Sequence, residues 1–515
     1  MVKAISENPE KVWDLIVIGG GATGLGTAVD ATTRGYDTLL LEQADFAKGT
    51  SSRSTKLVHG GVRYLAQGDV SLVLEALHER GLLRKNAPHL VKNLAFVIPN
   101  YEWWSGPFYA LGMKVYDMMA GKLGLGPSEM ITKEETIEAI PNIRTEGLRG
   151  GVIYYDGQFD DSRLAINLAQ TFSKNNGTIV NYFKVTGLLK YDELVTGVKA
   201  WDQETAQEYE IKAKVVVNAT GIFVDSIRRM DDPNNSDVIR PSQGVHLVLA
   251  KEFLKGDSAI MIPKTDDDRV LFAVPWHQRV IVGTTDTPVD KPELEPQALE
   301  EEVDFILSTA ARYLTRSPKR TDVLSVFAGL RPLAKTGEDD KETKEISRNH
   351  QLTVSLSGLI TVSGGKWTTY RKMGEDTVDK VALVGGLEER PCITKNMPIH
   401  GYAQNIQKDH LQVYGSDRAA ILQLIDERPE LAEKLHPNLD YIGAEVVWAV
   451  TEEMARTVED VLARRVRALF LDARASIKMA PKVAELMAQE LGRDQVWVDE
   501  QMEEYLALAQ KYILE

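Results

Sequence analysis

Cysteine is almost absent from this sequence: of 515 residues only Cys392 carries a thiol. A single cysteine excludes an internal disulfide and a metal site built from several thiolates, and it is typical of a protein from a reducing compartment. No cluster of His, Cys or Asp has metal-ligand spacing, and no G-x-S-x-G segment occurs. We therefore expect neither a metal site nor acyl-transfer chemistry.

Excess positive charge and long apolar runs are also absent. The formal net charge is −15, which argues against nucleic acid as a partner because phosphate binding needs a basic face. No stretch reaches the roughly 18 apolar residues that span a bilayer, and residues 1–11 lack the apolar core of a signal peptide. We expect a soluble or peripheral protein of the cytoplasm.

The first stretch with a clear function begins at residue 13 and reads strand, glycine turn, helix, strand. Gly19, Gly21 and Gly24 have G-x-G-x-x-G spacing after an apolar run at residues 15–18, and the second strand ends at Glu42. Such glycines form a tight turn, admit a pyrophosphate close to the backbone and let helix and strand pack closely. An acid about 20 residues further on binds a ribose diol. The stretch predicts a dinucleotide site.

Later segments are expected to meet the same dinucleotide. The hydroxyl-rich loop at residues 49–56 can hydrogen-bond phosphates and ribityl hydroxyls, and the paired glycines at 60–61 let a planar ring approach the backbone. A strand followed by a turn of small residues occurs twice, at 219–221 and at 364–366. The second of these turns opens a helix and adds a lysine, which makes its pocket positive. The predicted cofactor contacts are Gly19, Gly21, Gly24, Glu42, Thr50, Ser51, Ser52, His59, Gly60, Gly61, Val185, Ala219, Gly221, Gly365, Lys366, Trp367 and Thr368.

The remaining pattern predicts the domain organisation. Short alternating strands between residues 238 and 288 favour an antiparallel sheet, and a charged helix is expected from Pro296 to Leu314. From residue 398 strand signals almost vanish and helical patterns follow, including one at 481–491. We expect an oxidoreductase domain at 1–397, with substrate-binding segments near 75–150 and 238–335, and a helical C-terminal domain at 398–515.

Several motifs together resemble one known family. Segments 14–24, 50–65, 155–164, 217–225, 329–333 and 364–371 are similar to the FAD-dependent glycerol-3-phosphate dehydrogenases, and H-G-G-x-R-Y and G-G-K-x-T-T-Y-R are specific strings of that family. The helical stretch 452–465 looks like the family's C-terminal domain. The resemblance implies a glutathione-reductase-like FAD-binding Rossmann fold of α/β class, an antiparallel substrate domain and FAD as cofactor. It also implies that sn-glycerol 3-phosphate is oxidised to dihydroxyacetone phosphate and that a membrane quinone accepts the electrons.

Given that substrate, the residues suggest roles. Oxidation of the C2 alcohol needs a base near the hydroxyl, for which we choose His246, and a phosphate is best met by arginine forks, for which we choose Arg331 and Arg63, with Tyr64 beside them. Lys366 is expected to stabilise developing negative charge. A structural role stays open for each of these residues. His246 would be a hydrogen-bonded core histidine, Arg331 a member of a surface ion pair, Arg63 a helix-capping or interdomain residue, and Lys366 a lysine without a part in the reaction.

Other functions and surfaces also stay open. The alternatives are a glycerol-3-phosphate oxidase that reduces O2, a flavin-binding regulatory protein without catalysis, and an amino-acid or sarcosine-type oxidase. The apolar stretch 103–126 is either a core helix or a face that enters a membrane interface, and a basic cluster near residues 312–320 also suits anionic headgroups. We expect peripheral attachment to the inner face of the cytoplasmic membrane, with a homodimer possible through the C-terminal helices.

Overall fold

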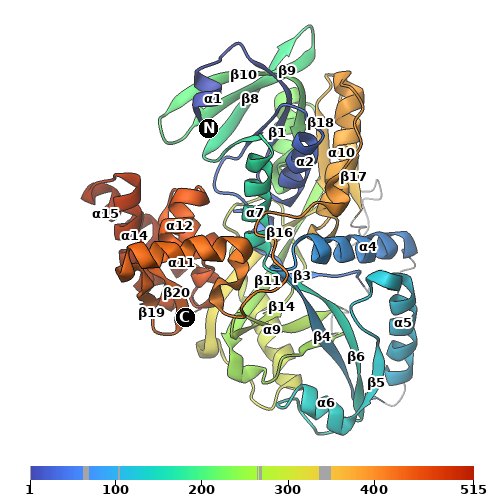
Figure 1. Ribbon diagram of the computed structural model, residues 1–515. Helices are drawn as coiled ribbons and strands as arrows, with labels where there is room; N and C mark the ends of the chain where they lie inside the picture. Colours follow the sequence, from blue (N-terminus) through green and yellow to red (C-terminus); the bar gives the residue numbers. More distant parts are fainter. Residues whose placement is uncertain are drawn as a thin grey trace.

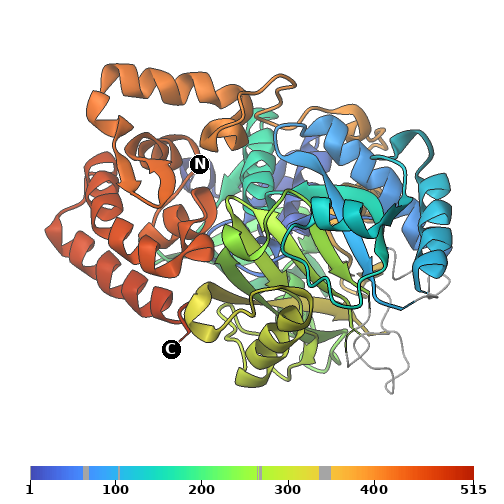
Figure 2. The same ribbon diagram turned by 90° about the horizontal axis from the view of Figure 1, so that it is seen from below.

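A computed structural model describes residues 2–61, 69–102, 105–263, 265, 269–335 and 349–514. Figure 1 shows two sheets, one above the other, and a group of C-terminal helices to one side of both. In both views these helices lie on the side opposite α4 (Val70–Asn86) and α5 (Ser105–Ala120) (Figures 1 and 2).

The upper sheet, eight-stranded in the described residues, has a parallel centre in the order β18-β10-β1-β2-β7. Its apolar runs are buried on both faces, as expected for parallel strands covered by helices. α2 packs against both α10 and α7. These elements are β1 (Val12–Ile18), β2 (Thr38–Leu41), β7 (Thr178–Val180), β10 (Gln207–Asn218), β18 (Ile360–Gly364), α2 (Ala22–Thr33), α7 (Asp161–Lys174) and α10 (Tyr370–Gly385).

Antiparallel strands join this sheet at β18 and at the first half of β10. β17 pairs with β18, and β9 pairs with both β8 and β10. These strands are β17 (His350–Val354), β8 (Phe183–Tyr191) and β9 (Leu194–Asp202), and the short helices nearby are α1 (Val2–Ser6) and α8 (Val224–Asp231).

The lower sheet, ten-stranded in the described residues, is antiparallel apart from the β4–β12 pair. The long β11–β16 pair lies at one side of it, and β11 also pairs with β14 and β15. Its strands are β3 (Leu57–Val58), β4 (Val91–Asn100), β5 (Glu129–Thr132), β6 (Gly150–Phe159), β11 (Ile239–Ala250), β12 (Ala259–Ile262), β13 (Leu271–Trp276), β14 (Arg279–Gly283), β15 (Thr287–Pro288) and β16 (Val323–Ala334). The predicted antiparallel sheet is therefore confirmed.

The charged helix predicted to begin at Pro296 begins later. α9 spans Glu300–Tyr313, and α6 (Lys133–Ala139) is the other helix beside this sheet. The buried Glu302 carboxylate accepts the backbone N–H of Leu299 at 3.0 Å, and it also bonds to Gln243 and Thr285 of the sheet region. The start of α9 is fixed by this tertiary contact, which overrides the local preference of proline for a first turn.

The C-terminal region is helical, as predicted, with two departures. A short hairpin pairs β19 (Lys434–His436) with β20 (Leu439–Ile442), and the helix predicted to begin at Pro481 begins eight residues earlier, at Ala473, with Pro481 inside it. Asp472 caps that helix by accepting the Ala475 N–H at 2.9 Å. The helices are α11 (Arg418–Glu427), α12 (Gly443–Glu452), a π-helical turn at Asp460–Arg465, α13 (Ala468–Leu471), α14 (Ala473–Leu491) and α15 (Gln495–Gln510).

Within the described ranges, no helix combines the length and the apolar character needed to cross a bilayer. The same residues hold no group of three or more His, Cys, Asp or Glu side chains arranged to bind a metal ion.

Candidate cofactor and substrate site

A cavity of about 460 Å³ lies at the carboxyl ends of β1, β2, β10 and β18. Parallel sheets bind ligands at this edge, because the helix N-termini point there. The loop after β2, the start of β8 and residues 364–367 complete its walls. The predicted cofactor contacts that line it are Gly19, Gly21, Glu42, Thr50, Ser51, Val185, Ala219, Gly221, Gly365, Lys366 and Trp367.

The glycines at this edge allow backbone segments to meet closely around the cavity. Gly19 has φ +110°, and a Cβ there would lie 2.6 Å from the Ala219 carbonyl oxygen. Gly21 precedes the first turn of α2, and it lines the cavity together with Ala22 and Thr23 of that turn, so the helix N-terminus lies at the cavity. Gly221, at φ +59°, has no atom within 4 Å of a built Cβ. This cradle fits the pyrophosphate of a dinucleotide.

Glu42 lies at the cavity wall with its carboxylate already oriented. Oε2 accepts the Gly20 N–H at 2.6 Å and Oε1 accepts the Ala44 N–H at 2.9 Å. Burial raises the pKa of Glu42, and these two backbone donors oppose that rise. A carboxylate has about four acceptor positions, so two remain for a ribose diol.

The hydroxyl-rich loop connects three parts of the site. Ser51 Oγ accepts the Ala22 N–H at 3.0 Å, and the Ser51 carbonyl accepts the Trp367 indole N–H at 2.8 Å. The Thr50 hydroxyl donates to the Leu330 carbonyl of β16 at 2.5 Å. The loop thus links helix α2, the residues before α10 and the lower sheet.

Six predicted cofactor residues do not line this cavity: Gly24, Ser52, His59, Gly60, Gly61 and Thr368. Gly24 instead allows α2 to approach β1, since a Cβ there would lie 1.8 Å from the Gly19 oxygen. The Ser52 carbonyl accepts the buried Lys56 ammonium at 2.7 Å. His59 donates its backbone N–H to Thr368, which follows the cavity residue Trp367.

His246 is buried in the lower sheet. Its Nε2 lies 2.9 Å from Thr55 Oγ1, its ring stacks on Phe327 at 4.9 Å, and its side chain is 2% exposed. Burial, with smaller contributions from the charges of Arg331 and Lys56, lowers the pKa of His246 well below its usual range. The imidazole is therefore neutral near pH 7, the state that a proton acceptor needs.

Arg331 shares a sheet face with His246. On the β11–β16 pair Arg331 lies opposite Ser242 and Phe327 lies opposite His246, and opposed residues on strands whose side chains alternate point to one face. Between them, at Gly244, a Cβ would lie 2.3 Å from Arg331 Nη2. The missing side chain lets the guanidinium lie over the strand toward the histidine.

Hydrogen bonds hold the Arg331 guanidinium in this position. Nη2 donates to Thr284 Oγ1 at 2.8 Å, Nη1 donates to the Gln243 carbonyl at 3.2 Å, and Asp286 lies 3.7 Å away. The next residue, Pro332, lines the cavity together with Lys366. Of these three predicted residues, Lys366 lines the cavity, whereas His246 and Arg331 lie on the strand pair whose Pro332 reaches it.

Arg63 and Tyr64, the other predicted substrate contacts, lie outside the described residues. Several further residues at the site escaped the sequence prediction, namely Lys48 and Phe223 at the cavity, Thr55 beside His246 and Thr284 beside Arg331. Thr55 follows the predicted hydroxyl loop, which is the one local signal that pointed to it. The others depend on contacts between segments far apart in the chain.

Comparison with known proteins gives the same assignment. A family model described as FAD dependent oxidoreductase matches residues 14–371, and one described as the C-terminal domain of alpha-glycerophosphate oxidase matches residues 362–497. The probable mitochondrial glycerol-3-phosphate dehydrogenase of Caenorhabditis elegans is 42% identical over 93% of this chain and 71% of its own length. The mitochondrial glycerol-3-phosphate dehydrogenase of Bos taurus is 39% identical over 97% of this chain and 73% of its own length.

A solved structure agrees over the entire chain. The glycerol-3-phosphate dehydrogenase from Bacillus halodurans, complexed with FAD, superposes with a TM-score of 0.82 at 31% identity and covers 100% of this chain and 97% of its own. The cradle described above fits that cofactor, and the expected fold class is confirmed. With the cavity, the sheet and these relatives in agreement, the chain belongs to the family of FAD-dependent glycerol-3-phosphate dehydrogenases.

Proposed function

We propose that this chain oxidises sn-glycerol 3-phosphate to dihydroxyacetone phosphate. The observation that carries the proposal is the single face of β11 and β16 that holds both His246 and Arg331, next in sequence to Pro332, which lines the cofactor cavity. FAD, when bound, supplies the acceptor for the hydride that leaves C2. The residues of the chain then have two tasks: to bind the phosphate and to take the proton of the C2 hydroxyl.

His246 takes the hydroxyl proton in this proposal. Its lowered pKa keeps the imidazole neutral before substrate arrives, and the Thr55 contact fixes the plane of the ring. The phosphate supplies negative charge that is absent from the free site, so the imidazolium is better tolerated once substrate is bound. The His246 imidazole is therefore a stronger base when substrate is bound than when the site is empty.

Arg331 binds the phosphate, because a planar guanidinium held by Thr284 and Gln243 offers donors in a fixed geometry. We propose that Arg63 and Tyr64 complete this binding wall. Lys366 follows Gly365 at the cavity, and we assign it to stabilising the negative charge that accumulates as the cofactor is reduced.

We further propose that the electrons pass to a membrane quinone from the inner face of the cytoplasmic membrane. Supporting this, Val70 and Leu74 of α4 and Leu111 and Met118 of α5 are exposed by 45–73%, and the two helices pack together. Apolar side chains grouped in this way suit a membrane interface. This surface, the α4–α5 face, is on the side away from the C-terminal helices (Figures 1 and 2).

The basic cluster near residues 312–320 supports membrane binding less well. Arg316 pairs with Glu252 and Asp322, and Arg320 pairs with Glu300 and Asp304. These carboxylates offset the charge that anionic headgroups would need. We therefore place the membrane contact on the α4–α5 face.

The division at residues 397 and 398 is also part of the proposal, as is a homodimer through the C-terminal helices. Supporting the division, the helices from α11 onward share one hydrophobic core with β19 and β20; this core continues into the lower sheet at Val248, Trp276, Ile281 and Phe327. Light scattering of the purified holoenzyme measures the oligomeric state directly.

Anaerobic titration tests the reaction. Glycerol 3-phosphate is expected to bleach the flavin, whereas glycerol, which lacks the phosphate, is not. Re-oxidation by a soluble quinone analogue should then be fast and re-oxidation in air slow. Fast peroxide formation in air would replace the dehydrogenase with an oxidase, and absence of bleaching would refute the substrate assignment.

A further inference from the structure

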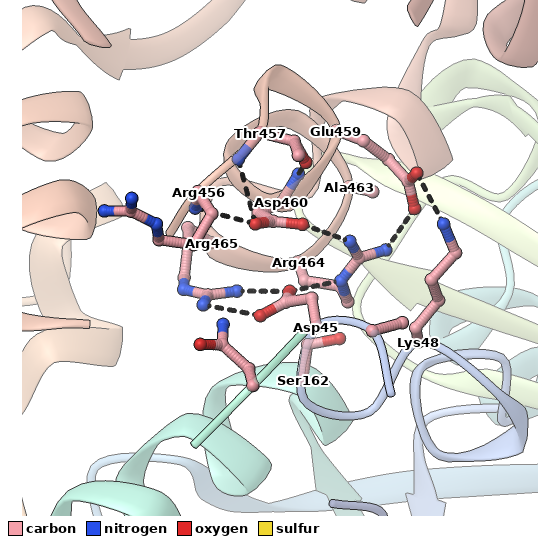
Figure 3. Close-up of polar contacts among 12 residues, drawn as sticks. Asp45, Lys48, Ser162, Arg456, Thr457, Glu459, Asp460, Ala463, Arg464 and Arg465 are labelled. Atoms are coloured by element: carbon pink, nitrogen blue, oxygen red, sulfur yellow. Dashed lines mark hydrogen bonds and ion pairs between the residues drawn. The ribbon is translucent and has the colours of Figure 1, made fainter. Parts of the chain in front are cut away.

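Behind the Glu42 end of the cavity, the C-terminal region contacts the loop after β2 through buried charges (Figure 3). Asp45 of this loop is fully buried and forms ion pairs with two arginines of the π-helical turn. Arg465 donates to both carboxylate oxygens at 2.7 and 2.9 Å, and Arg464 Nε donates to Oδ2 at 2.5 Å. Residues about 420 positions apart thus form one bidentate, charge-assisted contact.

A second ion pair joins the C-terminal region to a residue that lines the cavity. Lys48, which lines the cavity, pairs with Glu459 at 2.7 Å, and Glu459 in turn accepts a hydrogen bond from Arg464 at 2.7 Å. Figure 3 shows Lys48 and Asp45 on the same loop, facing the turn that carries both arginines. The C-terminal region therefore holds this wall of the cavity at two points.

A third link reaches the neighbouring segment of the cavity wall. Asp460 accepts hydrogen bonds from Arg464 Nη2 at 2.8 Å and from the Tyr182 hydroxyl at 2.7 Å. Tyr182 donates its backbone N–H to the Ala44 carbonyl at 3.2 Å and immediately precedes the wall residues Phe183, Lys184 and Val185. The short π-helical turn thus contacts both segments that form the Glu42 end of the cavity, although its own residues do not line the cavity.

The strength of these links follows from burial. Burial disfavours the charged form of the Asp45 carboxylate, but the positive charges of Arg465 and Arg464 hold the pKa of Asp45 at about 2. Removing one partner of such a buried pair is strongly destabilising, because it leaves an uncompensated charge out of contact with water. Asp45 also raises the pKa of Glu42 and Arg464 lowers it, so the arginine protects the charged state of the proposed ribose acceptor.

We infer that Asp45, Asp460, Arg464 and Arg465 are positioning residues for the cofactor: docking of the C-terminal region fixes the loop after β2 and the start of β8 at the Glu42 end of the cavity, and FAD binding and docking strengthen each other. Such coupling is reciprocal by thermodynamic necessity. This inference concerns retention of the cofactor, goes beyond the proposed reaction and does not depend on the identity of the substrate or of the electron acceptor.

Titration of apoenzyme with FAD tests the inference without substrate. Asp45→Asn should raise the Kd for FAD at least tenfold, and Tyr182→Phe, a mild change outside the cavity lining, should raise it about threefold. The matched control is Glu79→Gln, because Glu79 of α4 forms a buried bidentate pair with Arg371 of α10, outside the C-terminal network, and neither residue lines the cavity. That control should lower the Tm while changing the Kd less than twofold.

Hydrogen exchange measures the reverse direction. In the wild type, adding FAD should slow amide exchange in residues 453–465, although none of them lines the cavity; in Asp45→Asn this protection should be lost. If Asp45→Asn and Glu79→Gln lower the Tm equally and leave the Kd for FAD unchanged, the network is merely structural and the inference is wrong. If Asp45→Asn fails to fold, an unchanged Kd in Tyr182→Phe together with absent protection of residues 453–465 overturns it.

Discussion

The two ends of the site differ in the chemical groups that form them, backbone groups at one end and side chains at the other. The cofactor end uses backbone: glycines, the N-terminus of α2 and paired N–H groups that orient Glu42. The proposed substrate end uses side chains, His246 and Arg331, that the register of β11 and β16 brings to one face. Changes in backbone shape should therefore weaken cofactor binding. Changes in side-chain charge should instead lower the rate of the reaction and leave the cofactor bound.

The largest expected effect is at the cofactor end. In Gly24→Ala the new Cβ would lie 1.8 Å from the Gly19 carbonyl oxygen, so β1 and α2 must separate and the cradle must change shape. We expect purified protein without bound flavin, measured by the ratio of flavin to protein absorbance. Gly112→Ala in α5, where no atom lies within 4 Å of the built Cβ, is the control and should retain flavin fully.

The second effect isolates the substrate end. Arg331→Met removes the proposed phosphate partner, and truncating one partner of such a charge pair costs roughly 2–5 kcal/mol, so kcat/KM should fall by about 10²–10³. Flavin content should match the wild type. Arg316→Met, which removes a surface arginine paired with Glu252, should change kcat/KM less than twofold. Loss of flavin in the Arg331 variant would contradict the separation of the two ends.

A smaller effect concerns the base. Since His246 must be neutral to accept a proton and its folded pKa lies below 6.5, kcat/KM should show no histidine-dependent fall until the pH drops below about 6.5. The unfolded state binds more protons in that range, so stability should also decrease as the pH falls below about 6.5. The check is a pH profile of the wild type against His246→Asn. An acid limb centred above pH 7 would contradict a buried neutral base.

The smallest expected effect lies outside both ends. Leu111→Asp with Met118→Asp places charges on the α4–α5 face, where both side chains are exposed, so sedimentation with lipid vesicles should fall several-fold while activity with a soluble acceptor stays unchanged. Leu422→Asp, at an exposed position on α11, is the control. Unchanged sedimentation in the double variant would exclude this face as the membrane contact.

The sequence predicted the cofactor end more completely because its signals are local. Gly19, Gly21 and Glu42 occur within one strand–helix–strand unit, and the fold expected from them is confirmed. Contacts such as Thr284 with Arg331, or Asp45 with Arg465, join segments whose proximity depends on strand register and on docking of the C-terminal helices. No local spacing encodes these pairs. The misplaced start of α9 has the same origin, because Glu302 bonds across to the sheet. The misplaced start of α14 does not: Asp472 caps that helix locally, and the helix tolerates Pro481 in its interior.

Rapid anaerobic mixing with glycerol 3-phosphate labelled with deuterium at C2 tests the central claim most directly. If the face holding His246 and Arg331 presents C2 to the cofactor, the flavin should bleach in one turnover, more slowly with deuterium than with hydrogen at C2. His246→Asn, with full flavin content, should bleach far more slowly. Absence of bleaching, or a wild-type rate in His246→Asn, would contradict the account.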